Sequence, residues 1–125
     1  TRKLDLPIPK TNKSLSPGGH LLNSGHHGIS LSGDDKTICV AGTMDGYIAI
    51  VDRETFEYST INLSDDPKEA KPYWATSSKD GKKAYVSVSG LDKVSILDYA
   101  TGKVVAEVQV GNHPQRVRNG QLRLK

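Results

Sequence analysis

The stretch that decides the fold runs from Pro72 to Pro114 and reads PYWATSSKDGKKAYVSVSGLDKVSILDYATGKVVAEVQVGNHP. Shifting the sequence by 46 residues places His26–Asp52 over Pro72–Asp98 without a gap. A third copy opens at Pro114, which lies 42 residues after Pro72. An internal period of this length indicates a fold assembled from repeated units, and it is the strongest signal in the chain.

Each repeat contains short stretches of alternating apolar and polar residues separated by turn residues. The second repeat predicts strands at residues 74–78, 84–89, 94–98 and 104–110, and the first predicts strands at 28–32, 37–41, 47–51 and 57–62. Asp80-Gly81 predicts a tight hairpin in which both central residues have positive φ. Residues 64–70 predict a single helical turn with Ser64 as its N-cap, in a loop that makes the first repeat four residues longer.

Four short antiparallel strands in a repeat of this length predict an all-β fold, in which each repeat is one blade of a β-propeller. From Pro72, the pattern Ser-x-Asp-Gly-Lys-x-x-Tyr-Val, then Val-Ser-Ile-Leu-Asp, Thr-Gly-Lys-Val-Val and Val-Gly-x-x-Pro resembles the YVTN family of β-propeller repeats. The resemblance covers about residues 26–120, although His26 replaces the leading proline and Asp35 replaces the turn glycine. It implies a fold and not a particular function, because this scaffold serves many roles.

The repeats divide the chain into four parts. Residues 26–71 and 72–113 form two blades, and residues 114–125 form the start of a third repeat or a closing strand. Residues 1–25 form an irregular lead-in, or include the outer strand of a preceding blade. Because a propeller needs roughly four to eight blades to close, we expect an incomplete ring that represents the C-terminal part of a larger propeller. Alternatively, several copies close the ring together, or another chain supplies the missing blades.

Charge and cysteine content narrow the classes of partner. The net charge is +3, but the excess of Lys and Arg lies at the two ends, and the body between them is net acidic. Solvated or ion-paired ends explain this better than nucleic-acid binding. The single Cys39 excludes an internal disulfide and falls in a predicted strand, which indicates a buried thiol. The sequence has no apolar run of membrane-spanning length, and the family resemblance favours an exported protein.

A candidate ligand site follows from where each repeat begins. In a propeller, the segments that lead into successive innermost strands line one rim of the central channel, where polar and aromatic groups can form a ligand site. The rim residues predicted here are His26, His27, Tyr73, Trp74, Gln115 and Arg116. The alternative is structural, with Tyr73 and Trp74 packed between blades and Arg116 paired with a carboxylate.

Three histidines raise a second possibility. His20, His26 and His27 lie within eight residues, and imidazoles bind copper readily. The chain would then be the propeller part of a copper enzyme resembling nitrous oxide reductase. Against this, adjacent histidines in an extended segment point to opposite sides, and no Cys/His spacing typical of zinc is present.

We therefore expect a non-catalytic module that recognises a protein or small molecule at the rim, without a cofactor. The copper enzyme is the first alternative, and a structural surface or assembly module that self-associates is the second. Asp52 and Asp98 recur at one repeat position, which predicts that they cap turns and take no part in catalysis.

Overall fold

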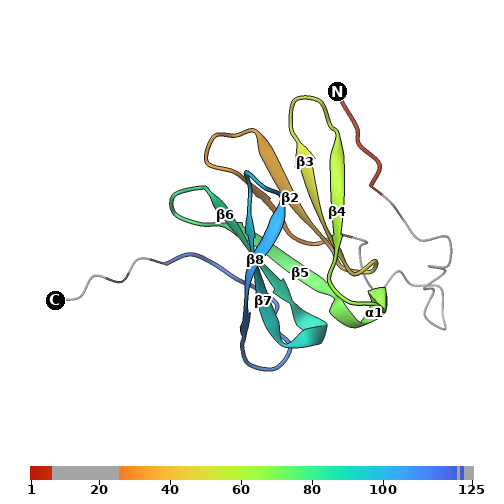
Figure 1. The fold of residues 1–125 in the computed structure, drawn as a ribbon, viewed down its shortest axis with the longest axis vertical. Helices are drawn as coiled ribbons and strands as arrows, with labels where there is room; N and C mark the ends of the chain where they lie inside the picture. Colours follow the sequence, from red (N-terminus) through yellow and green to blue (C-terminus); the bar gives the residue numbers. More distant parts are fainter. Residues whose placement is uncertain (7–25, 121, 123–125) are drawn as a thin grey trace.

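The structure is a computed structural model that describes residues 1–6, 26–120 and 122. It contains two four-stranded antiparallel sheets, each with its strands in sequence order, and Figure 1 shows how they pack against each other. The first sheet consists of β1 (Ile29–Leu31), β2 (Thr37–Gly42), β3 (Tyr47–Asp52) and β4 (Tyr58–Asn62). The second consists of β5 (Pro72–Ser77), β6 (Lys83–Val88), β7 (Lys93–Asp98) and β8 (Lys103–Gln109). The all-β prediction with four strands per repeat is confirmed.

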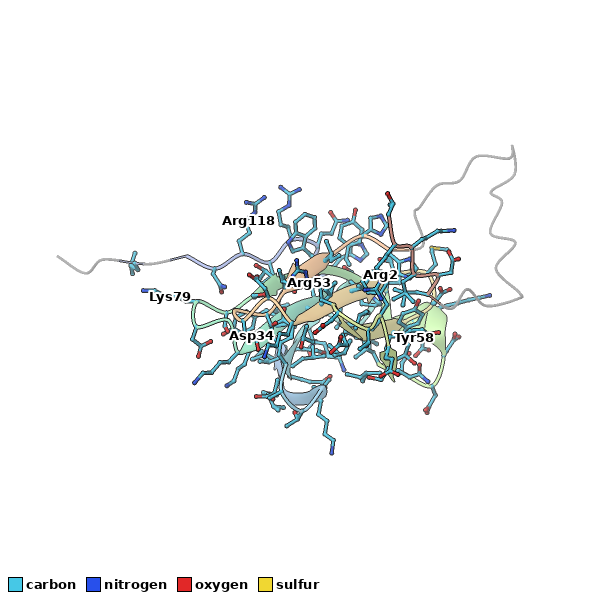
Figure 2. All side chains as sticks on the ribbon, turned by 90° about the horizontal axis from the view of Figure 1, so that it is seen from above. Arg2, Asp34, Arg53, Tyr58, Lys79 and Arg118 are labelled. Carbon is cyan, nitrogen blue, oxygen red and sulfur yellow. The ribbon has the colours of Figure 1, made fainter. Side chains whose placement is uncertain are left out.

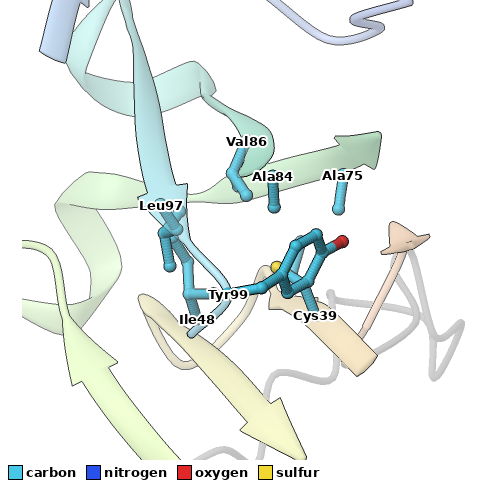
Figure 3. Packing of buried hydrophobic residues seen from close by; sticks show 8 residues of the cluster. Cys39, Ile48, Ala75, Ala84, Val86, Leu97 and Tyr99 are labelled. Atoms are coloured by element: carbon cyan, nitrogen blue, oxygen red, sulfur yellow. The ribbon is translucent and has the colours of Figure 1, made fainter. Parts of the chain in front are cut away.

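The main core lies between the two sheets. Alternation along β2 and β3 turns Cys39 and Ile48 towards the second sheet, where they meet side chains from β6 and β7. Figure 3 shows this cluster, with the Tyr99 ring beside Cys39. The buried members of the cluster are Cys39, Ala41, Ile48, Ala75, Ala84, Val86, Leu97 and Tyr99.

A chain of hydroxyl groups crosses the same interface. The Ser77 hydroxyl donates its only proton to the carbonyl of Leu31 at 2.5 Å. The Tyr99 hydroxyl, 2.8 Å from the Ser77 oxygen, must therefore donate to Ser77. The Ser30 hydroxyl, 2.8 Å from the Tyr99 oxygen, must in turn donate to Tyr99. One buried tyrosine thus joins a strand of each sheet through hydrogen bonds of fixed direction.

The first turn of each repeat is built from the same side-chain bonds. Ser78 donates to Asp80, whose carboxylate accepts the amide of Lys82, while the Ser78 oxygen accepts the amide of Lys83. Ser32 and Asp34 make the equivalent bonds in the first repeat. The expectation of two positive φ angles at Asp80-Gly81 is wrong: only Gly81 has one, at 68°. The side-chain bonds close a longer turn that needs a single left-handed residue.

Two further sequence expectations can be compared with the structure. Asp52 accepts the amides of Glu54 and Thr55, and Asp98 accepts the amide of Thr101, so both cap turns as predicted. Cys39 is fully buried, and burial raises the pKa of its thiol to about 12, as expected for an inert core cysteine.

The loop between the sheets contains the short helix α1 (Pro67–Ala70), but its N-cap is Asp66 and not the predicted Ser64. The Asp66 carboxylate accepts the amide of Lys68 at 2.9 Å, whereas Ser64 bonds the Asp66 carbonyl instead. The short 3-10 helix η1 (Ser89–Leu91) follows β6. Among the described residues, no helix is long and apolar enough to span a bilayer.

The N-terminal residues cover the outer face of the first sheet. Leu4 and Leu6 pack there against a cluster that includes Tyr47, Ala49 and Val51. The Arg2 guanidinium lies 4.4 Å from the centre of the Phe56 ring. Residues 1–6 contain no strand, and the rest of the predicted lead-in, residues 7–25, lies outside the described residues.

Candidate functional site

The lead-in segments of the two later repeats are attached in the same way. After β2, the Thr43 hydroxyl donates to the carbonyl of Pro72 at 2.6 Å. After β6, Ser89, which lies 46 residues later, donates to the carbonyl of Pro114. Each repeat thus fixes the first residue of the next one through a buried hydroxyl, and this places the rim segments at equivalent positions.

The attachment of Pro72 also fixes the tautomer of neutral His27. The only proton of the Thr43 hydroxyl goes to the Pro72 carbonyl, so its oxygen must accept a proton from His27 Nδ1 at 2.9 Å. In neutral His27 the proton is therefore on Nδ1, and Nε2 carries a lone pair. The imidazole stacks on the Tyr73 ring, with centroids 4.3 Å apart and planes 19° apart. Two predicted rim residues from successive repeats are thus in direct contact.

A β-bulge presents Tyr73 and Trp74. Pairing of β5 with β6 shifts by one residue between Pro72, opposite Val88, and Trp74, opposite Ser87. A bulge interrupts the alternation of side chains and re-aims them, and bulges are frequent next to functional sites. The amide of Trp74 donates to the Ser87 hydroxyl at 3.0 Å, so this serine stabilises the irregular strand.

Ser87 also holds the next rim segment. Its hydroxyl donates to the carbonyl of Gln115 at 2.6 Å, while its oxygen accepts the Trp74 amide. The adjacent Arg116 places its guanidinium 4.7 Å from the centre of a Trp74 ring, within cation–π range. Ser87 is fully buried, whereas Trp74 is half-buried and Arg116 is exposed. The pair thus rests on a buried support and faces solvent.

The C-terminal segment makes a side-chain-to-backbone hydrogen bond that has an equivalent in the second repeat. The Asn119 side chain donates to the carbonyl of Ser77, and the Ser77 side chain donates to the carbonyl of Leu31. These three residues occupy one position in successive repeats, at intervals of 46 and 42 residues. Residues 114–119 therefore lie against β5 much as β5 lies against β1. That they begin a third blade stays a prediction, and this contact supports it.

His26 lies on the other side of its segment, against the first sheet. Its Nε2 is 2.8 Å from the Tyr47 hydroxyl, and burial lowers the pKa of its imidazole. His26 and His27 thus have different partners, as expected for adjacent extended residues. His20 lies outside the described residues. Within the described part of the chain, no three His, Cys, Asp or Glu side chains are grouped to hold a metal ion, and copper binding stays a prediction.

Four of the six predicted rim residues form two contacting pairs, His27 with Tyr73 and Trp74 with Arg116. Gln115 joins them through its backbone carbonyl. Sequence reasoning missed the supporting hydroxyls of Thr43, Ser87 and Ser89. The signal for two of them was present, because Thr43 and Ser89 are hydroxyl residues at the same repeat position.

A hollow lies between the sheets at the opposite end of β1, away from the rim. It has a volume of about 470 Å³ and is lined by the two Ser/Asp turns together with Asp98, Tyr99 and Ala100. Hydrogen bonds from Ser32 and from the Lys36 amide lower the pKa of Asp34, and the equivalent bonds lower the pKa of Asp80. These carboxylates are engaged in closing their turns.

The fold is that of part of a β-propeller. The chain is similar to hydrazine synthase of Kuenenia stuttgartiensis, with a TM-score of 0.62 and 22% identity over 78% of this chain and 27% of that chain. It is similar to virginiamycin B lyase of Staphylococcus aureus, with a TM-score of 0.60 and 14% identity over 81% of this chain and 36% of that chain. It is also similar to apo AztD of Citrobacter koseri, with a TM-score of 0.57 and 20% identity over 72% of this chain and 25% of that chain.

This chain therefore spans only about a quarter to a third of each of these proteins. Identities this low establish the shared fold and nothing about ligand or reaction. No protein-family model matches the sequence, and no curated protein matches it either.

Proposed function

We propose that the chain is part of a propeller of YVTN-like repeats that binds a ligand, without catalysis, at the rim formed by His27, Tyr73, Trp74 and Arg116. The observation that carries this proposal is that adjacent residues of β5 contact the lead-in segments of both neighbouring repeats: Tyr73 stacks on His27, and Trp74 makes a cation–π contact with Arg116. The groups are half-buried or exposed, so they are available to a ligand.

The chemistry of the rim fits binding. Stacked rings offer flat apolar surface, and a guanidinium offers planar hydrogen-bond donors. The residues that hold these groups use backbone carbonyls and buried hydroxyls, which makes the site pre-organised. Pre-organisation reduces the entropy that a site loses when it binds a ligand.

The partners that we propose are further blades, supplied by the same protein, by another chain or by further copies. Ile29 is 67% exposed, whereas Ala75, its equivalent in the second repeat, is 3% exposed because the first sheet covers it. Leu4 and Leu6 pack against the buried residues on the outer face of the first sheet, which adds apolar side chains to that face. Both observations support a preceding blade on that face.

The mass of the particle in solution tests the need for partners. A closed oligomer, or co-purification with a larger propeller polypeptide, would support the proposal. A stable, well-folded monomer whose Ile29 side chain stays in contact with water would refute it.

Ligand binding at the rim can be followed through Trp74, because it is the only tryptophan in the chain. A panel of small acids, amines and neutral amides should contain members that change Trp74 emission in a saturable way. If no member of the panel does so in the folded protein, the rim is a structural feature and the proposed function fails.

A further inference from the structure

We propose that the rim recognises an organic acid, whose carboxylate or phosphate group is received by Arg116 while its apolar body lies on the neighbouring rings. This inference rests on the proposed binding function and names the class of ligand.

Arg116 has its hydrogen-bonding edge available. Its guanidinium carbon lies 4.7 Å from the centre of the Trp74 ring. The two salt bridges among the described residues are Lys3–Asp5 and Lys93–Glu107, and neither involves Arg116. The N–H groups of a guanidinium form a planar fork that matches a carboxylate or phosphate.

The surroundings of Arg116 favour an anion. Residues 112–120 contain Arg116 and Arg118 and no acidic residue. Figure 2 shows Arg118 projecting from the C-terminal segment away from the sheets. A nearby carboxylate, Asp92, accepts the backbone amide of His113 at 2.8 Å and carries one negative charge. The two arginines of residues 112–120 outnumber it, so this segment is basic and attracts anions.

The backbone that carries Arg116 is fixed, which distinguishes it from an ordinary surface arginine. Hydrogen bonds hold the three preceding residues: His113 through Asp92, Pro114 through Ser89 and Gln115 through Ser87. Both serines are buried. Little backbone entropy therefore remains to be lost at this segment when an anion binds.

The neighbouring aromatic residues indicate that the acid carries a flat apolar group. Trp74 is half-buried and contacts Arg116 directly. Tyr73, also half-buried, precedes Trp74 at the bulge of β5 and stacks on His27. Aromatic surface beside Arg116 favours a small aromatic acid over inorganic phosphate or acetate, because the ring adds an apolar contact that these small anions use little.

The test compares six probes by Trp74 emission and by calorimetry: benzoate, phenyl phosphate, acetate, inorganic phosphate, benzamide and benzylamine. Benzoate or phenyl phosphate should bind about tenfold or more tightly than benzamide, because hydrogen bonds to charged groups are the stronger class. Arg116→Gln should remove that advantage. Arg53→Gln is the matched control, because Arg53 bonds the Asp35 carbonyl on the first sheet and should leave binding unchanged.

The outcomes separate this inference from the proposed function. If benzamide or benzylamine binds as tightly as benzoate and Arg116→Gln has no effect, the rim binds ligands but the inference about acids is wrong. If acetate and inorganic phosphate bind as tightly as their aromatic counterparts, the apolar part of the inference is wrong. If none of the probes changes Trp74 emission or releases heat, the proposed binding function fails with it.

Discussion

Replacing Ser87 with alanine should weaken the fold and disturb the rim together. The Ser87 hydroxyl accepts the Trp74 amide at 3.0 Å and donates to the Gln115 carbonyl at 2.6 Å. A net hydrogen bond in a protein contributes about 0.5–1.5 kcal/mol, so losing two should cost about 1–3 kcal/mol of unfolding free energy. The upper part of that range applies if the Trp74 amide is left without a partner.

Ser95→Ala is the matched control. Ser95 is also fully buried in the second sheet, but its hydroxyl makes one bond, to Glu107 at 3.1 Å, away from the rim. Its loss should cost about 0.5–1.5 kcal/mol. Urea unfolding followed by circular dichroism gives both values, and the emission maximum of Trp74 reports the rim in each variant.

Ser87→Ala should shift Trp74 emission because Arg116 is released from the ring, whereas Ser95→Ala should leave emission unchanged. The reasoning is refuted if Ser87→Ala unfolds at the wild-type urea concentration with unaltered emission. It is also refuted if the two variants change emission equally, since the rim would then respond to any weakening of the sheet.

Three further predictions concern the packing of the sheets and their dependence on pH. Gly28→Ala should lower the free energy of unfolding, measured by urea titration, by about 1–3 kcal/mol, because the new Cβ would lie 2.3 Å from the Ala75 amide nitrogen. Gly111→Ala is the control and should leave this free energy nearly unchanged, since no atom lies within 4 Å of the new Cβ. Tyr99→Phe should cost about 1–3 kcal/mol in thermal or urea unfolding, because it interrupts the hydroxyl chain between the sheets, and an unchanged midpoint would show that water replaces the bonds. Burial lowers the pKa of His26 from 6.5, so below that pH the unfolded chain binds more protons than the folded one. Stability should therefore decline as pH falls through 6.5, and His26→Asn should flatten this decline in urea midpoints measured on either side.

Much of the fold could be predicted because residues close together in the sequence determine the turns and strands of each repeat. The Ser-x-Asp turns recur at the same spacing, and alternation along the strands places Cys39 and Val86 in the core. The N-cap of α1 was misassigned because Ser64 and Asp66 are both good capping residues, and only the backbone path decides between them.

The sequence predicted which residues form the rim, but it did not predict the hydrogen bonds that hold them in place. Repeat alignment placed Tyr73 and Trp74 at the start of a repeat, and a rim follows from that position. The bulge at Tyr73 and the double role of Ser87 depend on pairing between strands and on a segment 28 residues away. Contacts of this kind produce no repeating pattern in the sequence from which they could be predicted.

The most direct test is a comparison of amide proton–nitrogen NMR spectra of the folded protein with and without benzoate. Binding at the rim predicts shifts centred on Tyr73, Trp74 and Arg116, with a weaker response at His27. Shifts centred on the Ser/Asp turns at the opposite end of β1, or no shifts at all, would contradict it.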